Sequence, residues 1–447
     1  MATLQVKILF AGVLLISFIS ELKAEFTGTW EQELAYSTTS GGKRLQKFEA
    51  LIAPQWSKSF EHFDLTAIGH IQLNTQSQLN TDSQQNLPNE SAINASFYRG
   101  QRNRINLREL YLDTTWLDID WRIGKQQVVW GQADGLKVLD QVNPQSFREF
   151  ILDDFDDSRI PLWMVNVVYP LGDDSLQLLW IPDATGHELP PSESPYYFTS
   201  SLLIPQAPLD ASGKPLVPVT LNDVQQTRRF FKDSDFGLKY SLFTDTGWDI
   251  TLNYLYHYLD LPVLYQKPVG SGSDFHIDIQ PRYERSHLVG ATLSNAFGSF
   301  TLRTEIAYSS DTFHLADTQK KEGVVNSEDI SSVLGVDYLG FEDTMLSIQW
   351  FQSTLLHSEK LIKRDRTNHT MTILAQRYFE NQTWNLEAIV IIGLNQTEGL
   401  FRPKVSKQLT SELELWLGAD IVYGGAQDLY GQFAQQDRLI AGFEYGF

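Results

Sequence analysis

The chain has 447 residues and no proline-, glycine- or serine-rich linker that would divide it, so one large domain is expected. Its 55 acidic residues outnumber 35 lysines and arginines, and the formal net charge of -20 argues against a nucleic-acid partner. Cysteine is absent, which excludes disulfides, thiolate metal sites and thiol nucleophiles.

The first 24 residues have the pattern of a signal peptide. Lys7 precedes an apolar run from Ile8 to Ile19, and the segment ends at Ala24. This run is shorter than the roughly 20 residues that span a bilayer, so we expect residues 1–24 to be cleaved. No later segment approaches about 18 consecutive apolar residues, and the mature chain has no predicted transmembrane helix.

From residue 25 onward, apolar and polar residues alternate with period two over stretches of roughly ten residues. The clearest stretch runs from Trp248 to Tyr258, where Asp249, Asn253 and His257 share one face and aromatic or aliphatic residues fill the other. Leu255 is the exception. The pattern predicts strands that face lipid on one side and a polar lumen on the other.

The connections between these strands alternate between short turns and long polar segments, as in outer-membrane barrels. The short turns lie near 117–118, 172–173, 245–247, 297–298, 342–343 and 381–382. The long segments cover about 75–101, 132–160, 183–229, 260–280, 311–329 and 353–370. We therefore predict that residues 25–447 form one transmembrane antiparallel β-barrel of about 18 strands (16 to 18), with both termini on the periplasmic side.

The C-terminal strand and the aromatic residues support this prediction. Residues 439–447 alternate up to Phe447, which resembles the sorting signal read by the barrel-assembly machinery of Gram-negative outer membranes. Aromatic residues are placed to form interfacial girdles: Trp30, Trp56, Trp116, Trp121, Trp248, Trp350, Trp384 and Tyr445. Expected partners are therefore outer-membrane lipid, lipopolysaccharide and the assembly machinery. The alternative fold is a soluble β-sandwich.

The sequence carries no recognised catalytic or cofactor motif, so we predict neither an enzyme nor a cofactor. The run from His287 to Asn295 spaces its histidine and serine too widely for a hydrolase triad. A weak metal-site candidate is the acidic run Asp153, Asp154, Asp156 and Asp157. It lacks the spacing and glycine of a calcium loop, and a solvated acidic loop is the alternative.

Residues 121–164 are the least generic stretch, and we expect a loop here that folds into the lumen. Asn143 followed by Pro144 indicates a short helix over 143–152, with Glu149 in reach of Arg148 and Arg159. The pore or constriction candidates are Arg122, Lys125, Gln126, Trp130, Asp134, Asp140, Asn143, Arg148 and Arg159. The alternative role of these residues is to fasten the loop to the barrel wall.

The same stretch resembles a known family. The run from Arg122 to Gln126, Trp130-Gly131, and Asp140 to Pro144 are similar to the motif block of a proteobacterial outer-membrane β-barrel family of unknown function. Its members are often encoded beside RND-type exporters and a periplasmic partner. The resemblance implies a porin-like barrel and transport of hydrophobic or lipid-like compounds. It supplies no substrate-binding residues.

Two functions follow from these observations. The first is a porin-like channel or transport-associated barrel, which passes hydrophobic or lipid-like compounds together with an RND-type export system, and whose acidic lumen would favour cations. The alternative is a structural or adhesive barrel acting through its long extracellular loops, above all the proline-rich segment 183–229. A barrel hydrolase has the least support.

Overall fold

The computed structural model describes residues 25–39, 45–76, 79, 89–207, 216–224, 229–316, 320–357 and 362–447. The predicted signal peptide, residues 1–24, lies outside the described residues, as do parts of the predicted long segments 75–101, 183–229, 311–329 and 353–370.

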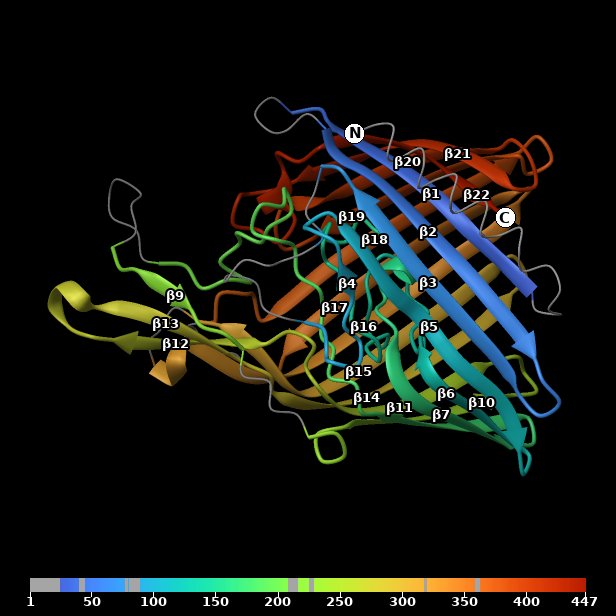
Figure 1. Cartoon of the computed structure of the whole chain (residues 1–447), viewed down its shortest axis with the longest axis horizontal. Coiled ribbons are helices and arrows are strands. Elements are labelled where there is room, and N and C mark those ends of the chain that lie inside the picture. Colours follow the sequence, from blue (N-terminus) through green and yellow to red (C-terminus); the bar gives the residue numbers. More distant parts are fainter. Residues whose placement is uncertain are drawn as a thin grey trace.

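The chain forms a closed antiparallel β-barrel of 18 strands, within the predicted range (Figure 1). Strand β1 pairs with both β2 and β22, which closes the sheet. The barrel strands are β1 (Glu25–Ser37), β2 (Leu45–Ser59), β3 (Asp64–Asn74), β5 (Asn103–Trp116), β6 (Ile119–Gln126), β7 (Leu162–Leu171), β8 (Asp174–Ile181), β10 (Asp235–Phe243), β11 (Asp249–Tyr258), β14 (Arg285–Phe297), β15 (Phe300–Leu315), β16 (Val324–Phe341), β17 (Thr344–Leu355), β18 (Thr367–Phe379), β19 (Trp384–Gly393), β20 (Glu398–Gln408), β21 (Leu413–Tyr423) and β22 (Arg438–Gly446).

The remaining elements are short. Strand β4 (Phe97–Tyr98) pairs with β5, and the helical turns are α2 (Phe155–Ser158), η1 (Gly272–Asp274), η2 (Lys320–Gly323) and η3 (Gly431–Phe433). In the described part of the chain, no helix has the length and apolar character needed to cross a membrane.

The predicted alternation sorts side chains between lumen and lipid. On β11, Thr251, Asn253 and His257 are buried, whereas Leu252 is 55% exposed and Tyr254 is 37% exposed on the outer face. Leu255, the exception in the pattern, also points inward and is buried. The inward-facing side chains are covered because loops fill much of the lumen.

The short turns gather at one end of the barrel, at the right in Figure 1, where the C-terminus also lies. At the β5–β6 turn, Leu117 and Asp118 have positive φ values of 55° and 58°, the conformation of a tight hairpin turn. Exposed aromatic side chains ring this end and include Trp116, Phe297, Phe300, Phe341 and Tyr445. Such a belt marks a membrane–water interface, and the short turns identify the periplasmic side.

The opposite, extracellular end differs from the prediction in two places. The predicted loop 260–280 contains the hairpin of β12 (Val263–Val269) and β13 (His276–Arg282), joined by β9 (Val219–Leu221), and this arm projects from the barrel in Figure 1. The predicted loop 311–329 is wrong over most of its length, because β15 and β16 continue their ladder to Leu315 and Val324. In β12, β13, β15 and β16, backbone pairing therefore continues on the extracellular side, beyond the part of the barrel that faces lipid.

Candidate functional site

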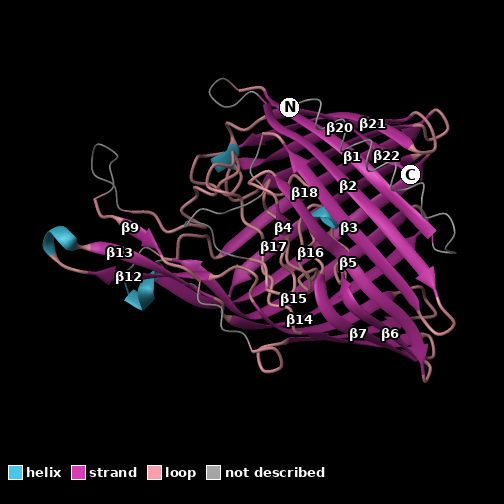
Figure 2. Cartoon of the chain, viewed as in Figure 1, coloured by secondary structure: helices cyan, strands magenta, loops and turns pink. Residues whose placement is uncertain are grey.

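Residues 127–161, here called the inward loop, connect β6 to β7. Their blue-green trace runs inside the barrel in Figure 1, among the loops that Figure 2 draws in pink within the strands. The first half of the loop packs on the wall from β8 to β17, where Trp130 and Leu139 join a buried apolar cluster with Leu255. Two wall glycines make room for them. A Cβ atom added to Gly237 would lie 2.9 Å from the Trp130 ring, and one added to Gly290 would lie 2.3 Å from Leu139 Cδ2.

Polar side chains of the wall hold the same half of the loop. The buried carboxylate of Glu305 on β15 accepts hydrogen bonds from the backbone N–H groups of Gln132 and of Leu139, the latter at 3.1 Å. Asp134 accepts a 2.9 Å hydrogen bond from Gln349 and forms an ion pair with Arg303. These contacts fix the path of the loop. Loss of the Glu305 carboxylate in particular would leave two backbone N–H groups of the loop without their hydrogen-bond acceptor.

The neck of the inward loop is closed by Asn143. Its Oδ1 accepts a 2.8 Å hydrogen bond from the N–H of Val128, and its Nδ2 donates to the carbonyl of Ile160 at 3.0 Å. The predicted helix over 143–152 is wrong. Residues 144–147 are extended and pair with 158–160 on one side and 188 on the other, and the loop's only described helical turn is α2.

The second half of the loop crosses to the opposite wall. Phe150 and Leu152 pack in a second apolar cluster with Leu400 and Phe433. Arg148 donates to both carboxylate oxygens of Glu49, at 2.8 and 2.9 Å.

Glu149 lies beside two cations of the wall, 2.9 Å from Arg438 and 3.4 Å from Lys47. The predicted proximity of Glu149 to Arg159 therefore does not lead to an ion pair; Arg159 binds Asp140 at 2.8 Å. Burial raises the pKa of Glu149, but Lys47 and Arg438 outweigh burial and hold this pKa down at about 2. Glu149 therefore stays ionised and bound at physiological pH.

Three paired loop segments lie across the lumen, between two cavities. Residues 144–148 of the inward loop lie between residues 158–160 and 187–188, and we call these three segments the partition. The N–H of Phe147 donates to the Glu188 carbonyl at 2.7 Å, and the N–H of Ser146 donates to the Ser158 carbonyl at 2.7 Å. Arg104 of β5 ties the partition to the wall through a 2.8 Å ion pair with Glu188.

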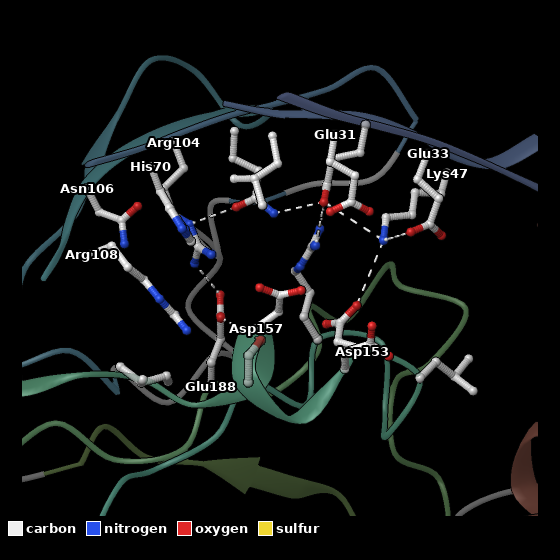
Figure 3. Close-up of a pocket in the computed structure, with 18 of the residues that line it drawn as sticks. Glu31, Glu33, Lys47, His70, Arg104, Asn106, Arg108, Asp153, Asp157 and Glu188 are labelled. Carbon is white, nitrogen blue, oxygen red and sulfur yellow. Dashed lines mark hydrogen bonds and ion pairs between the residues drawn. The ribbon is translucent and has the colours of Figure 1, made fainter. Parts of the chain in front are cut away.

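Successive residues of the partition face opposite sides. Ser146, Arg148 and Glu188 line one compartment, and Phe147 and His187 line another. The first compartment, here the charged cavity, has a volume of about 140 Å³ and is bounded by β1, β2, β3, β5 and the inward loop. In Figure 3, His70, Arg104 and Arg108 approach it from one side, with Glu31, Glu33 and Lys47 on the other and Asp153 and Asp157 of the loop between.

Eight carboxylates and eight lysine or arginine side chains line the charged cavity. The acidic excess of the whole chain is therefore not concentrated in the charged cavity. Acidic and basic side chains are equal in number there, so the lining does not support the cation preference expected from the sequence. Burial raises the pKa of Asp153 to about 6, against the opposing effect of Lys47, whose Nζ lies 3.8 Å from Asp153 Oδ1. Asp153 thus gains a proton as the pH falls through about 6, and burial also raises the pKa of Asp157, a second loop carboxylate of the cavity.

The second compartment, here the vestibule, lies on the extracellular side of the partition and has a volume of about 970 Å³. Its walls come from the inward loop, the segment 187–205, and residues at the bases of β9, β12, β13, β15 and β16. Most of its lining residues are aliphatic or aromatic, including Phe147, Phe198, Leu203 and Phe313. The vestibule is therefore an apolar chamber above a charged one.

The structure separates the predicted site residues into three groups. Lys125 and Arg148 line the charged cavity. Arg122 lies apart, near the short-turn end, where it pairs with Asp113 at 2.7 Å. The third group makes contacts that hold the inward loop: Trp130, Asp134, Asp140, Asn143, Arg159 and Gln126, whose backbone carbonyl accepts from Asn143. Asp140 and Asn143 of this group also line the vestibule.

The acidic candidates do not form a ligand cluster. Asp156 is bound to Arg159, Asp153 lies near Lys47, and Asp154 and Asp157 line the cavity. Across the described ranges, no three His, Cys, Asp or Glu side chains are grouped as metal ligands would be.

Sequence reasoning missed the wall partners of the loop. Lys47, Glu49, Arg104 and Arg108 line the cavity, and Arg438 binds both Glu149 and Asp420. A usable signal was charge on the inward face of otherwise apolar strands, because a charge placed there must find a partner.

The closed barrel, its aromatic belt and its inward loop define a porin-like protein of the Gram-negative outer membrane. The family described as "Protein of unknown function (DUF1302)" matches residues 69–437, and the chain belongs to this family. A search of curated proteins by sequence found no match.

Solved structures of similar fold support this class. OccAB2 of Acinetobacter baumannii superposes with a TM-score of 0.53 at 10% identity, covering 95% of this chain and 98% of that chain. OpdK of Pseudomonas aeruginosa, solved with vanillate, gives 0.51 at 11% identity with coverage of 95% and 98%. A BenF-like porin from Pseudomonas fluorescens Pf-5 gives 0.50 at 10% identity with coverage of 95% and 98%. At these identities the likeness concerns the fold.

Proposed function

We propose that the protein is a solute channel of the outer membrane, in which the inward loop sets a narrow charged passage below an apolar vestibule. The observation that carries this proposal is the partition, because it divides the lumen of a closed barrel into two compartments of different chemistry. Porins use a loop at this position, with opposed charges, to restrict and select solutes.

The two volumes set the size of what can pass. The charged cavity, at about 140 Å³, has roughly one seventh of the volume of the vestibule. The vestibule, at about 970 Å³, is large enough for a drug-sized molecule. Ions and small polar solutes fit the passage as it stands, and larger solutes require the partition to move.

The test is conductance in a planar bilayer. Residues 25–447 should give small, discrete openings, and replacing residues 144–158 with a short glycine-serine linker should increase the conductance several-fold. The control removes only the tip of the β12–β13 hairpin, residues 268–276, which does not line the vestibule, and should leave conductance unchanged. Equal conductance with and without residues 144–158 would contradict the proposal.

The transport of hydrophobic or lipid-like compounds is a finer proposal, supported by the apolar walls of the vestibule. We further propose that an RND-type exporter and its periplasmic partner cooperate with the barrel. We expect the exporter's periplasmic component to co-purify with the membrane-embedded barrel. Altering the periplasmic turns should abolish this co-purification.

The exposed outer face and belt also support outer-membrane lipid and lipopolysaccharide as surroundings, and the barrel-assembly machinery as the partner during insertion. The similar folds belong to channels, so we propose no enzymatic activity.

The second candidate function, an adhesive barrel, is favoured by the projecting arm of β9, β12 and β13. Shortening this arm should abolish surface attachment without changing conductance if that function is real.

A further inference from the structure

The vestibule has the features of a binding site for one class of small molecule. Its walls are mainly apolar, and its volume of about 970 Å³ lies at the upper end of the range for ligand pockets. Water in such a chamber lacks hydrogen-bond partners on most sides, so an apolar molecule that displaces it gains free energy.

The charged groups of the vestibule disfavour an ionic ligand. Lys137 and Asp140 form a 3.0 Å ion pair, and Asp140 also binds Arg159 at 2.8 Å. Asp260, the other carboxylate of the lining, also makes an interaction within the protein. A charged ligand would lose its hydration and would compete with these existing contacts.

One side chain of the partition offers a specific hydrogen bond. His187 lines the vestibule and is absent from the lining of the charged cavity. Its Nδ1 accepts a 2.9 Å hydrogen bond from the N–H of Gln145, so the proton of the neutral ring lies on Nε2. Burial lowers the pKa of His187 to about 3, which keeps the ring neutral at physiological pH. Within the described ranges, Nε2 has no hydrogen-bond partner.

We propose that the vestibule binds an uncharged, mostly apolar small molecule that carries one hydrogen-bond acceptor, and that the Nε2–H of His187 donates to this acceptor. That the bound molecule then crosses the membrane rests on the proposed channel function. The present proposal adds the chemical class of the ligand and a residue that determines specificity. Apolar contacts supply most of the affinity, and His187 distinguishes a carbonyl compound from its hydrocarbon analogue.

The test uses two probes of nearly equal size, 2-acetylnaphthalene and 2-ethylnaphthalene, which differ by one carbonyl oxygen. Binding is measured by equilibrium dialysis against the barrel in lipid nanodiscs, with empty nanodiscs subtracted. Saturable binding is expected, with the acetyl compound bound roughly three- to tenfold more tightly, as one hydrogen bond allows.

Two variants and a matched control locate the site. Leu203→Trp fills the vestibule and should weaken both probes at least tenfold, whereas Leu394→Trp, on an exposed turn outside it, should change neither. His187→Asn keeps an acceptor near the Nδ1 position for Gln145 but replaces the ring Nε2–H by a shorter amide group that does not reach the same point, and should reduce the preference for the acetyl compound. Resistance of each folded barrel to unfolding in detergent shows that the variants are intact.

Absence of saturable binding, or binding that is indifferent to Leu203→Trp, would overturn the proposal. Equal affinities of the two probes for the unsubstituted protein would overturn the role of His187. Because dialysis involves no current, these outcomes are independent of the conductance test, and a failed conductance test would leave the binding result standing.

Discussion

At the scale of single residues, Asp153 connects the chemistry of the charged cavity to pH. Its side chain is 21% exposed and faces both the cavity and the ammonium of Lys47. Burial raises the pKa of this carboxyl to about 6, so a proton binds as the pH falls through that value. Protonation of Asp153 below about pH 6 removes one negative charge from the cavity.

We therefore predict that ion preference shifts toward anions between pH 7 and pH 5, roughly one pH unit to either side of the pKa. Reversal potentials in a salt gradient measure this preference. Asp153→Asn should show the low-pH preference at both values and remove most of the dependence. A pH response that persists in this variant would assign the titration to another group. His187 is excluded as that group because its pKa lies at about 3.

The sequence singled out the segment that lies inside the barrel, but not the contacts that its residues make. The inward loop stood out because its residues fit neither strand alternation nor a simple turn. The partners of Arg148 and Glu149, Glu49 and Arg438, lie 99 and 289 positions away along the chain. No local spacing encodes such pairs, because they depend on how the barrel closes.

At the scale of elements, the inward loop is fastened more firmly than an ordinary surface loop. The pair of Arg148 and Glu49 is bidentate, and the two side chains are 6% and 7% exposed. Removing one partner of a buried pair leaves an uncompensated charge, at a cost of about 3–5 kcal/mol. Gln72 and Asn74 would still donate to Glu49, which reduces that cost.

We predict that Arg148→Met loosens the second half of the loop, with larger and noisier single-channel currents and faster protease cleavage within residues 144–158. The double exchange Arg148→Glu with Glu49→Arg should restore part of the original behaviour. The control is Arg122→Met, which removes an equally bidentate pair with Asp113 whose side chains are 40% and 35% exposed. Similar effects of both single substitutions would contradict the prediction.

Among the elements, strands were predictable and the interior of the loop was not. Alternation identifies a strand because lumen and lipid impose opposite requirements on neighbouring residues. The signal for a helix at Asn143-Pro144 was misleading. Asn143 instead uses its side chain to bind Val128 and Ile160 across the neck of the loop. The arm of β12 and β13 was missed because its strands lie outside the membrane pattern.

At the scale of the whole molecule, the lipid-facing band fixes how the barrel sits in the membrane. On β16, Leu334 is 46% exposed near the middle of the strand, and Leu339 is 55% exposed near the aromatic belt. Arginine at the bilayer midplane destabilises a barrel by about 2–4 kcal/mol, against about 0–1 kcal/mol near an interface. The position of a substitution along this strand therefore determines its cost.

We predict that Leu334→Arg lowers the free energy of unfolding by about 2–4 kcal/mol and that Leu339→Arg lowers it by at most about 1 kcal/mol. Reversible urea unfolding in lipid vesicles, followed by tryptophan fluorescence, measures both. Equal losses would mean that the band lies elsewhere along the barrel axis.

The architecture as a whole was predictable to the level of strand number and orientation. Alternating short and long connections require an even number of strands, and this parity constrains the count better than any single strand does. The division of the lumen was not predictable, because it requires the inward loop and residues 187–188 to meet, and these come from different connections.

In the proposed channel, the partition places two chambers in series, with the vestibule toward the cell exterior and the charged cavity toward the periplasm. The rate of passage is then set by one barrier, while occupancy of each chamber depends on the solution it faces. A molecule that fits only the outer chamber would obstruct flow when added outside the cell and have no effect from the periplasm. Such sidedness would let the cell surface regulate the channel without any change in the charged passage beneath.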